Sequence, residues 1–278
     1  MDNLYTHQSK YHLIEVFGDE MSKAVTMDKT PHLTTLDYYR YTESLAIVPY
    51  LFTRFARKVL ILGAGFGLTV KKLLDVYESE IESLTLVEID PEVVEVGKTF
   101  FDFPTNNSKV KVAIKDAWDF MQANNEKWDL ILADYSTPLF PYSERLYTKE
   151  HISDIHNCLR KWGVFAMAIH SLWTNPMAAS CIIGTVASEF QGKYILPYRV
   201  HLPAHPPPGE AGFVIAAPYS RQLTVPHGLE YLNDFNVQSM FWMNNDEMYP
   251  EIPASTIDNA MYARLCGEPF DRSISEDI

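Results

Sequence analysis

The sequence predicts an α/β protein in which helices cover a parallel sheet and a small β-sheet comes before it. Three observations support this fold class. From residue 58 onward, short apolar strands alternate with helical segments. These strands are apolar at successive positions, as expected when both faces of a sheet are buried. Residues 11–37 instead form short β-like segments separated by Gly, Asp, Lys and Pro.

The expected elements follow in chain order. The segments YHLIEVFG, SKAVTMD and TPHLTTLD are expected to be strands of the N-terminal sheet. Residues 38–55 have helical spacing, with Pro49 expected to bend or interrupt the helix. The tail from about residue 231 is expected to be irregular helix. The expected strands of the large sheet are 58–63, 82–89, 109–114, 128–133, 164–169, 193–199 and 212–217, and its helices are 68–77, 93–101, 117–124, 148–161 and 177–190.

Composition excludes several classes of function. The 278 residues include 36 acidic and 23 basic side chains, which give a formal net charge of −13 and a pI of about 5.1. We therefore expect neither nucleic acid nor an anionic membrane as a partner. The three cysteines are far apart, which argues against a zinc ribbon or a disulfide framework. The absence of a signal-like N-terminus and of long apolar runs favours a cytoplasmic protein.

A glycine loop follows the first strand of the large sheet. Gly63, Gly65 and Gly67 lie in ILGAGFGLT, between a strand and a helix, where glycine permits a tight turn and close approach to a ligand. Glu88 closes the next strand and could bind both hydroxyls of a ribose, and Asp116 follows the third strand. The sequence lacks the last glycine of a pyrophosphate-binding loop, which favours a nucleoside without a pyrophosphate as the ligand. Taken singly, either carboxylate could equally be a helix cap or a solvated strand end.

A third carboxylate ends the fourth strand. Asp134, in DLILADYSTP, follows an apolar run, so we expect it at the same edge of the sheet as the glycine loop. There it could hold an ammonium group or accept a proton from an attacking amine. A turn-initiating Asp is the alternative interpretation.

The motifs together resemble one family. The runs VLILGAGFGLT, LTLVEIDPEVVEVGK, VKVAIKDAWDFM, WDLILADYSTP, LYTKEHISDIHNCLRKWGVFA and LPAHPPPGEAGFVIAA are similar to those of the spermidine synthase family of aminopropyltransferases. The resemblance implies the Rossmann-like fold of S-adenosylmethionine-dependent methyltransferases with a small N-terminal β domain. Residues 1–50 would form the β-strand domain with its linking helix, and residues 51–278 the donor-binding catalytic domain. A homodimer is also implied.

The resemblance assigns roles to individual positions. Asp134 matches the family's catalytic Asp, and Tyr41 its partner tyrosine, near Glu43 at the mouth of the site. The acceptor would contact Tyr135, Thr137 and His205. The positions implied to bind the donor are His12, Gly63, Ala64, Gly65, Phe66, Glu88, Ile89, Asp116, Ala117 and Asp134. No metal is implied.

Three positions depart from the family pattern. Phe66 replaces an Asp that would contact the amine of decarboxylated S-adenosylmethionine, Thr137 replaces a second Asp that faces the polyamine, and His205 replaces a tyrosine. An Asp at position 66 would repel the carboxylate of intact S-adenosylmethionine by up to about 4 kcal/mol at about 4 Å. Its absence favours intact S-adenosylmethionine as the donor of a 3-amino-3-carboxypropyl group. Decarboxylated S-adenosylmethionine, as the donor of an aminopropyl group, stays open as the alternative.

The same departures lead to an expectation about the acceptor. Fewer carboxylates, with His201 and His205 in the acceptor loop, favour a non-polyamine acceptor. Within the wider family, the pattern resembles the transferases of microcin C biosynthesis, which act on the phosphate of a peptidyl-nucleotide. In-line displacement on the donor would release methylthioadenosine. Two alternatives stay open: a polyamine aminopropyltransferase in which Glu43 or Glu210 contacts the amines, and a catalytically silent nucleoside-binding protein.

Overall fold

The computed structural model describes residues 1–136, 143–204, 209–244, 248–249 and 251–267. The chain begins with an antiparallel sheet of four strands in the order β1-β2-β3-β4. These strands are β1 (Asp2–Gln8), β2 (Leu13–Gly18), β3 (Lys23–Met27) and β4 (Thr30–Thr34). The sequence did not indicate β1, because almost all its side chains are exposed and no apolar alternation marks it.

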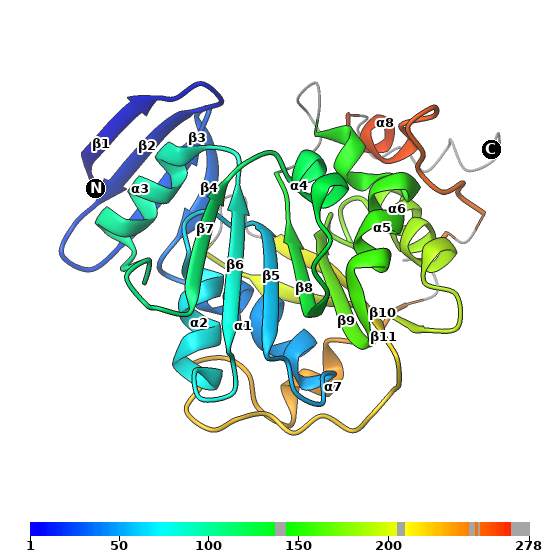
Figure 1. The fold of residues 1–278 in the computed structure, drawn as a ribbon. Helices are drawn as coiled ribbons and strands as arrows, with labels where there is room; N and C mark the ends of the chain where they lie inside the picture. Colours follow the sequence, from blue (N-terminus) through cyan, green and yellow to red (C-terminus); the bar gives the residue numbers. More distant parts are fainter. Residues whose placement is uncertain (137–142, 205–208, 245–247, 250, 268–278) are drawn as a thin grey trace.

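The second sheet has seven strands in the order β10-β11-β9-β8-β5-β6-β7 (Figure 1). Strand β11 runs antiparallel to both of its neighbours, β10 and β9, so the expectation of a parallel sheet is corrected at this edge. The short connection between β10 and β11 permits only a hairpin, because a parallel crossover needs about a dozen residues or more. The strands are β5 (Lys58–Gly63), β6 (Ser83–Glu88), β7 (Val110–Ile114), β8 (Trp128–Asp134), β9 (Leu159–Ile169), β10 (Tyr194–Leu202) and β11 (Gly209–Ala217).

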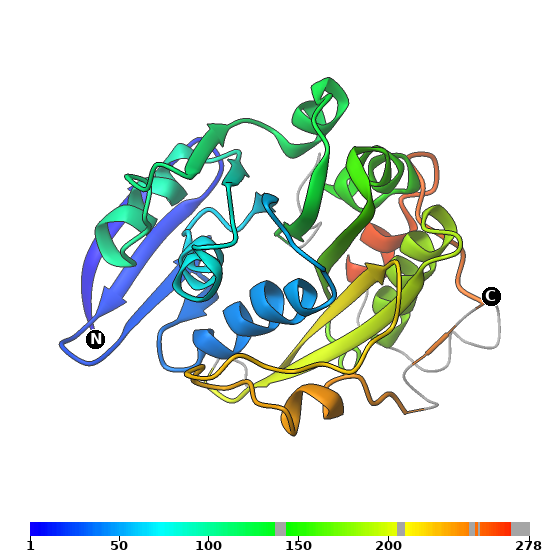
Figure 2. The same ribbon diagram turned by 60° about the horizontal axis from the view of Figure 1, so that its bottom comes forward.

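Helices cover both faces of this sheet (Figures 1 and 2). Val59 and Ile61 of β5 face a core that contains α1 and α2, whereas Leu60 and Leu62 face a core that contains α4, α5 and α6. This alternation explains why the strand is apolar at every position. The helices are α1 (Tyr38–Leu51), α2 (Leu68–Tyr77), α3 (Pro91–Phe100), α4 (Ala117–Ala123), α5 (Lys149–Cys158), α6 (Pro176–Glu189), α7 (Asn236–Ser239) and α8 (Met261–Gly267), with a 3₁₀ turn η1 (Glu144–Tyr147).

Two helix ends differ from expectation. Helix α5 ends at Cys158 rather than near residue 161, because Leu159 already pairs with Trp128 in the sheet. Helix α1 ends at Leu51, two residues after Pro49, rather than near residue 55. No helix in the described part of the chain is long and apolar enough to span a bilayer.

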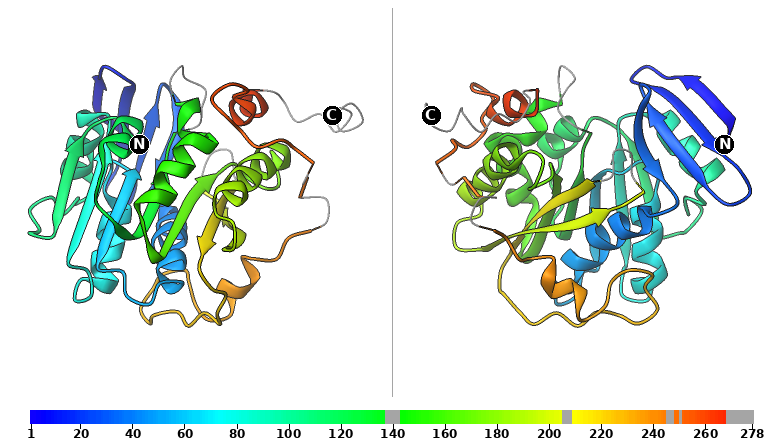
Figure 3. Two further views of the ribbon diagram at one scale, coloured as in Figure 1. Left: turned by 45° about the vertical axis from the view of Figure 1, so that its right-hand side comes forward. Right: turned by 180° about the vertical axis from the view of Figure 1, so that it is seen from behind.

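The N-terminal sheet packs against the large sheet's glycine loop and α3 (Figure 3). Its buried residues Ile14, Val16, Val25 and Leu33 form one apolar cluster with Phe66, Val93, Val96 and Phe101. Burying this much apolar side-chain surface stabilises the contact between the two sheets. Because Phe66 lies within the glycine loop, between Gly65 and Gly67, the same cluster fixes the loop beside the N-terminal strands.

Candidate active site

The candidate site lies where β5, β6 and β8 end. Gly63 and Asp134 are paired in the register of β5 and β8, and Glu88 is the last residue of β6. The carboxyl ends of parallel strands are the usual ligand-binding edge of such sheets. The structure therefore brings the glycine loop and both strand-end carboxylates together, as the sequence predicted.

The glycine loop leaves no room for a side chain at Gly63 or at Gly65. Gly63 has a φ of +82°, and a Cβ there would lie 2.1 Å from the carbonyl oxygen of Asp134. A Cβ on Gly65 would lie 2.5 Å from Oε2 of Glu88. Ala64 also has a positive φ, 58°, in the left-handed region that usually favours glycine. The loop is thus held tightly against the two carboxylate-bearing strands.

Glu88 is a half-buried carboxyl with a perturbed pKa. Burial raises its pKa to about 7, although hydrogen bonds from the backbone of Asp90, Ile89 and Gly65 favour the charged form. The N–H of Asp90 donates to Glu88 Oε1 at 2.9 Å. Near neutral pH, a carboxyl with this pKa is protonated in part of the molecules and ionised in the rest. A ligand that donates hydrogen bonds would favour the ionised form.

We expect Glu88→Gln to change stability in a pH-dependent way. The pKa of Glu88 in the folded state, about 7, lies above its ordinary value of 4.5, so the folded state binds this proton more tightly than the unfolded state. That contribution to stability is complete below pH 4.5 and is lost as pH rises through 7, an effect of about 3 kcal/mol. The variant has no such proton to lose. Its free energy of unfolding, relative to that of the natural protein, should therefore be higher at pH 8 than at pH 5.

Urea unfolding at the two pH values measures this difference. Glu82→Gln, which removes an exposed carboxylate just before the same strand, is the control and should change stability little at either pH. If the difference between the Glu88→Gln variant and the natural protein stays the same at both pH values, the assigned pKa is wrong.

Asp134 forms a short hydrogen bond with a tyrosine of α1. The Tyr41 hydroxyl donates to Asp134 Oδ1 at 2.5 Å. Burial raises the pKa of Asp134 to about 6, and the bond from Tyr41 partly opposes this shift. Burial and the nearby Asp134 charge raise the pKa of Tyr41 well above its ordinary value, so the phenol stays protonated. Tyr38 stacks on Tyr41 with ring centroids 5.2 Å apart, which fixes the orientation of the Tyr41 hydroxyl.

Asp116 has two partners in the structure. Its Oδ1 accepts the N–H of Trp118 at 2.8 Å and so caps α4, which begins at Ala117. Its Oδ2 lies 2.7 Å from Nη2 of Arg145, and that guanidinium also lies over the Trp118 ring. The helix-cap interpretation therefore applies to Asp116, and its predicted contact with a nucleoside stays a prediction. The sequence offered no signal for Arg145, a partner 29 residues away.

Two further residues predicted at the donor site, His12 and Ile89, lie beside or within the N-terminal part of the chain. His12 Nδ1 is 2.7 Å from Oδ2 of Asp28, within the small sheet. Ile89 borders a cavity of about 360 Å³, which is also lined by His7, Lys10 and Glu92. The contacts predicted for His12 and Ile89 with a donor stay predictions.

Phe66 has a structural role that the sequence did not reveal. Its side chain is only 4% exposed and packs on Phe101, with ring centroids 5.9 Å apart, and on His32. The apolar contact between the two sheets accounts for a phenylalanine here. The substitution is therefore no evidence for a donor that carries an extra carboxylate.

The predicted acceptor residues are only partly described. Thr137 and His205 lie outside the described residues. The Tyr135 hydroxyl is 2.7 Å from Nε2 of His151, so the Tyr135 side chain is held against α5. Burial lowers the pKa of His151 to about 3, so this contact joins two neutral groups. The predicted contact of Tyr135 with an acceptor stays a prediction.

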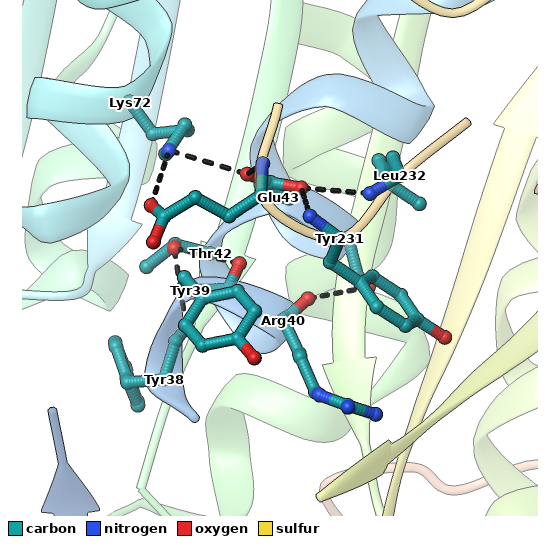
Figure 4. A network of polar contacts seen from close by, with 10 residues as sticks. Tyr38, Tyr39, Arg40, Thr42, Glu43, Lys72, Tyr231 and Leu232 are labelled. Carbon is teal, nitrogen blue, oxygen red and sulfur yellow. Dashed lines mark hydrogen bonds and ion pairs between the residues drawn. The ribbon is translucent and has the colours of Figure 1, made fainter. Parts of the chain in front are cut away.

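Glu43 and Glu210, considered above as partners for an amine, already have partners. Glu43 is fully buried and accepts backbone N–H groups of residues 230–232, with Lys72 alongside (Figure 4). This placement corrects the expectation that Glu43 lies at the mouth of the site. Glu210 accepts from the Ser171 hydroxyl at 3.1 Å and pairs with Arg199.

Within the described residues, no group of three or more His, Cys, Asp and Glu side chains is arranged so that it could hold a metal ion.

Comparisons with known proteins identify related sequences and structures. A family model described as the spermine/spermidine synthase domain matches residues 38–221. The chain is 30% identical over 224 residues to a polyamine aminopropyltransferase of Thermoplasma acidophilum, covering 79% of this chain and 80% of the relative. It is also 30% identical to a polyamine aminopropyltransferase of Corynebacterium efficiens, covering 92% of this chain but only 50% of that longer protein. Spermidine synthase from Thermotoga maritima has the same fold, with a TM-score of 0.77, 20% identity, and coverage of 88% and 85% of the two chains.

These findings correct the main functional prediction. We expected a non-polyamine acceptor, with the phosphate of a microcin C-type peptidyl-nucleotide as an example. The curated relatives are polyamine aminopropyltransferases, which contradicts that expectation and favours the polyamine alternative. The physical error was to interpret Phe66 as a change in ligand chemistry, whereas its side chain is part of the apolar contact between the sheets.

Proposed function

We propose, since this chain belongs to the spermine/spermidine synthase family, that it is a polyamine aminopropyltransferase. The donor would be decarboxylated S-adenosylmethionine, and the acceptor a small polyamine. The observation that carries the proposal is the Tyr41–Asp134 hydrogen bond at the end of β8, directly beside the glycine loop. A half-buried carboxylate with a pKa of about 6 can hold an amine and accept its proton near neutral pH.

The proposed donor site uses the edge formed by β5, β6 and β7. Glu88 would bind the ribose hydroxyls, and the tight glycine loop would pass beneath the nucleoside. Asp116 and Ala117 would contact the adenine, with Arg145 holding the Asp116 carboxylate in place. Ile89 would border the nucleoside, and His12 would lie near the donor. These roles are supported by the position of each residue at the carboxyl edge or on the N-terminal side of the sheet.

The proposed reaction is a displacement at carbon. The acceptor nitrogen attacks the propyl carbon bonded to sulfur, and the carbon–sulfur bond breaks with its electron pair passing to sulfur. Neutral methylthioadenosine leaves, and the proton of the new secondary ammonium passes to Asp134. Because the sulfonium is already an activated leaving group, the main contribution of the protein is to align the reactants. Tyr41 would hold the Asp134 carboxylate in that alignment.

Release of methylthioadenosine tests the function directly. Purified protein would be assayed with decarboxylated or intact S-adenosylmethionine, each with and without putrescine or spermidine. We expect release only with the decarboxylated donor and a polyamine. Release with the intact donor and no polyamine would contradict the proposal, and donor binding without any release would favour the catalytically silent alternative.

We also infer the domain division and assembly implied by the family. Residues 1–50 would be the N-terminal domain with its linking helix, and residues 51–278 the catalytic domain. A homodimer would give twice the chain mass in light scattering.

A further inference from the structure

The C-terminal segment, residues 251–267, lies beyond residues 38–221 that the family model matches. It ends in α8, which packs beside α6 and η1, at the opposite end of the molecule from the N-terminal sheet (Figures 1 and 3). Nothing in the proposed function uses this segment.

Hydrogen bonds between buried groups fix the segment to the helical layer. The N–H of Lys149, at the start of α5, donates to the carbonyl of Ser255 at 2.9 Å. The N–H of Ser255 donates to Thr185 Oγ1 at 2.8 Å, and the N–H of Tyr262 donates to Ser255 Oγ at 3.2 Å. Ser255 and Thr185 are both buried. The segment is therefore an integrated part of the fold.

Tyr262 is the residue that this segment brings to the sheet. Its side chain is 1% exposed, and its hydroxyl lies 2.8 Å from Nδ1 of His170, the residue that follows β9. Burial lowers the pKa of His170 to about 4, so the imidazole is neutral. The ring of Tyr262 also packs on Tyr147, with ring centroids 4.5 Å apart.

Tyr147 connects this contact to the turn after Asp134. Its hydroxyl lies 2.9 Å from the carbonyl oxygen of Ser136 and 3.1 Å from that of Tyr135, so it holds the first two residues beyond β8. Burial, the Cys266 thiol and the charge of Asp134 raise the pKa of Tyr147 well above its ordinary value. A continuous set of contacts thus runs from Tyr262 through Tyr147 to the backbone beside Asp134.

The strand order places these contacts on one side of Asp134. The glycine loop, Glu88 and Asp116 follow β5, β6 and β7, on one side of β8. His170 follows β9, on the other side of β8. Since the proposed donor site is at β5–β7, the side of Asp134 where Tyr262 and His170 meet is the side away from the donor.

We propose that Tyr262 is a positioning residue for the acceptor, holding the turn after Asp134 through Tyr147 and the end of β9 through His170. This inference rests on the proposed function for its kinetic consequence. The C-terminal segment would then determine acceptor affinity without contacting the donor.

Tyr262→Phe tests the proposal with the ring retained. We expect the KM for the polyamine to rise about 3- to 10-fold while the KM for the donor changes less than about twofold, and Tyr262→Ala to enlarge the difference. Tyr50→Phe is the matched control, because Tyr50 is 5% exposed and its hydroxyl donates to Glu80 at 3.2 Å in the opposite core. An equal rise in both KM values, or the same rise in the control, would overturn the proposal.

Hydrogen exchange gives a second measurement that needs no activity. Amide exchange at residues 135 and 136 should be faster in Tyr262→Ala, which removes the ring that packs on Tyr147, than in the natural protein, and unchanged in Tyr50→Ala. If the natural protein transfers no aminopropyl group, the proposed function fails while this measurement still tests the contact. Unchanged exchange at these amides would show that Tyr262 does not position the turn.

Discussion

Asp134→Asn is expected to lower kcat by about two to four orders of magnitude, the range in which positioned acids and bases contribute. The amide has nearly the same shape, and its oxygen can still accept the Tyr41 hydrogen bond. What it loses is the negative charge that would hold the amine and the site that would take its proton. The variant should therefore remain folded and bind the donor.

The pH profile separates the two roles of this carboxylate. Burial raises the Asp134 pKa to about 6, so a base at this position is protonated and inactive in more acidic solution. For the natural enzyme kcat/KM should fall below pH 6, and Asp134→Asn should abolish this dependence. A variant that loses turnover equally at every pH, with the acidic fall retained, would show that Asp134 orients the amine and is not the base.

Asp129→Asn is the matched control on the same strand. Asp129 lies near the amino end of β8, where it pairs with Arg160 and accepts the backbone N–H of Lys58. Its loss should lower stability and leave the pH profile of kcat/KM unchanged. A comparable fall in kcat in both variants would mean that the Asp134 effect is a general loss of structure.

Local patterns predicted the central elements of the fold well. Strand β5 and helix α2 have the expected bounds, because a continuous apolar run and an amphipathic period each specify one structure. Strand β1 was missed because both of its faces are largely exposed, and the direction of β11 could not be inferred from its composition. The carboxyl ends of β5, β6 and β8 converged as expected, because that convergence follows from parallel strands.

Interactions between distant residues account for what the sequence did not reveal. Phe66 was interpreted from its departure from the family pattern, but its role depends on contacts with the N-terminal sheet. Tyr262 and His170 are 92 residues apart, and no periodicity connects them. Glu43 accepts hydrogen bonds from backbone groups nearly 190 residues later in the chain. The sequence around Glu43 does not indicate these partners. Such pairings follow from the assembled tertiary structure.

Glu43→Ala is expected to have the largest effect on stability. The carboxylate has no exposed surface, and it accepts the N–H groups of Glu230, Tyr231 and Leu232 at 2.9–3.0 Å. Alanine would leave three backbone donors and the Lys72 ammonium without this partner (Figure 4). Breaking a buried, hydrogen-bonded charge typically costs about 3–5 kcal/mol, which corresponds to a Tm lower by roughly 10 °C or more at this size.

Two comparisons test this explanation. Glu230→Gln removes the exposed partner of the same lysine, 3.6 Å from Nζ and 64% exposed, and should change Tm by no more than about 2 °C. Glu43→Gln keeps the size of the side chain but replaces an accepting oxygen with an NH₂ group, so it should also be destabilised. A Tm for Glu43→Ala within about 2 °C of the natural protein would contradict the assigned network.

The same anchor has a consequence for catalysis. Glu43 lies two residues after Tyr41 in α1, so its bonds to residues 230–232 fix the helix that presents Tyr41 to Asp134. Below its Tm, Glu43→Ala should therefore lower kcat more than Glu230→Gln does, because a loosened helix lengthens the Tyr41–Asp134 hydrogen bond. Equal kcat values for folded Glu43→Ala and the natural protein would show that α1 is positioned by its apolar packing alone.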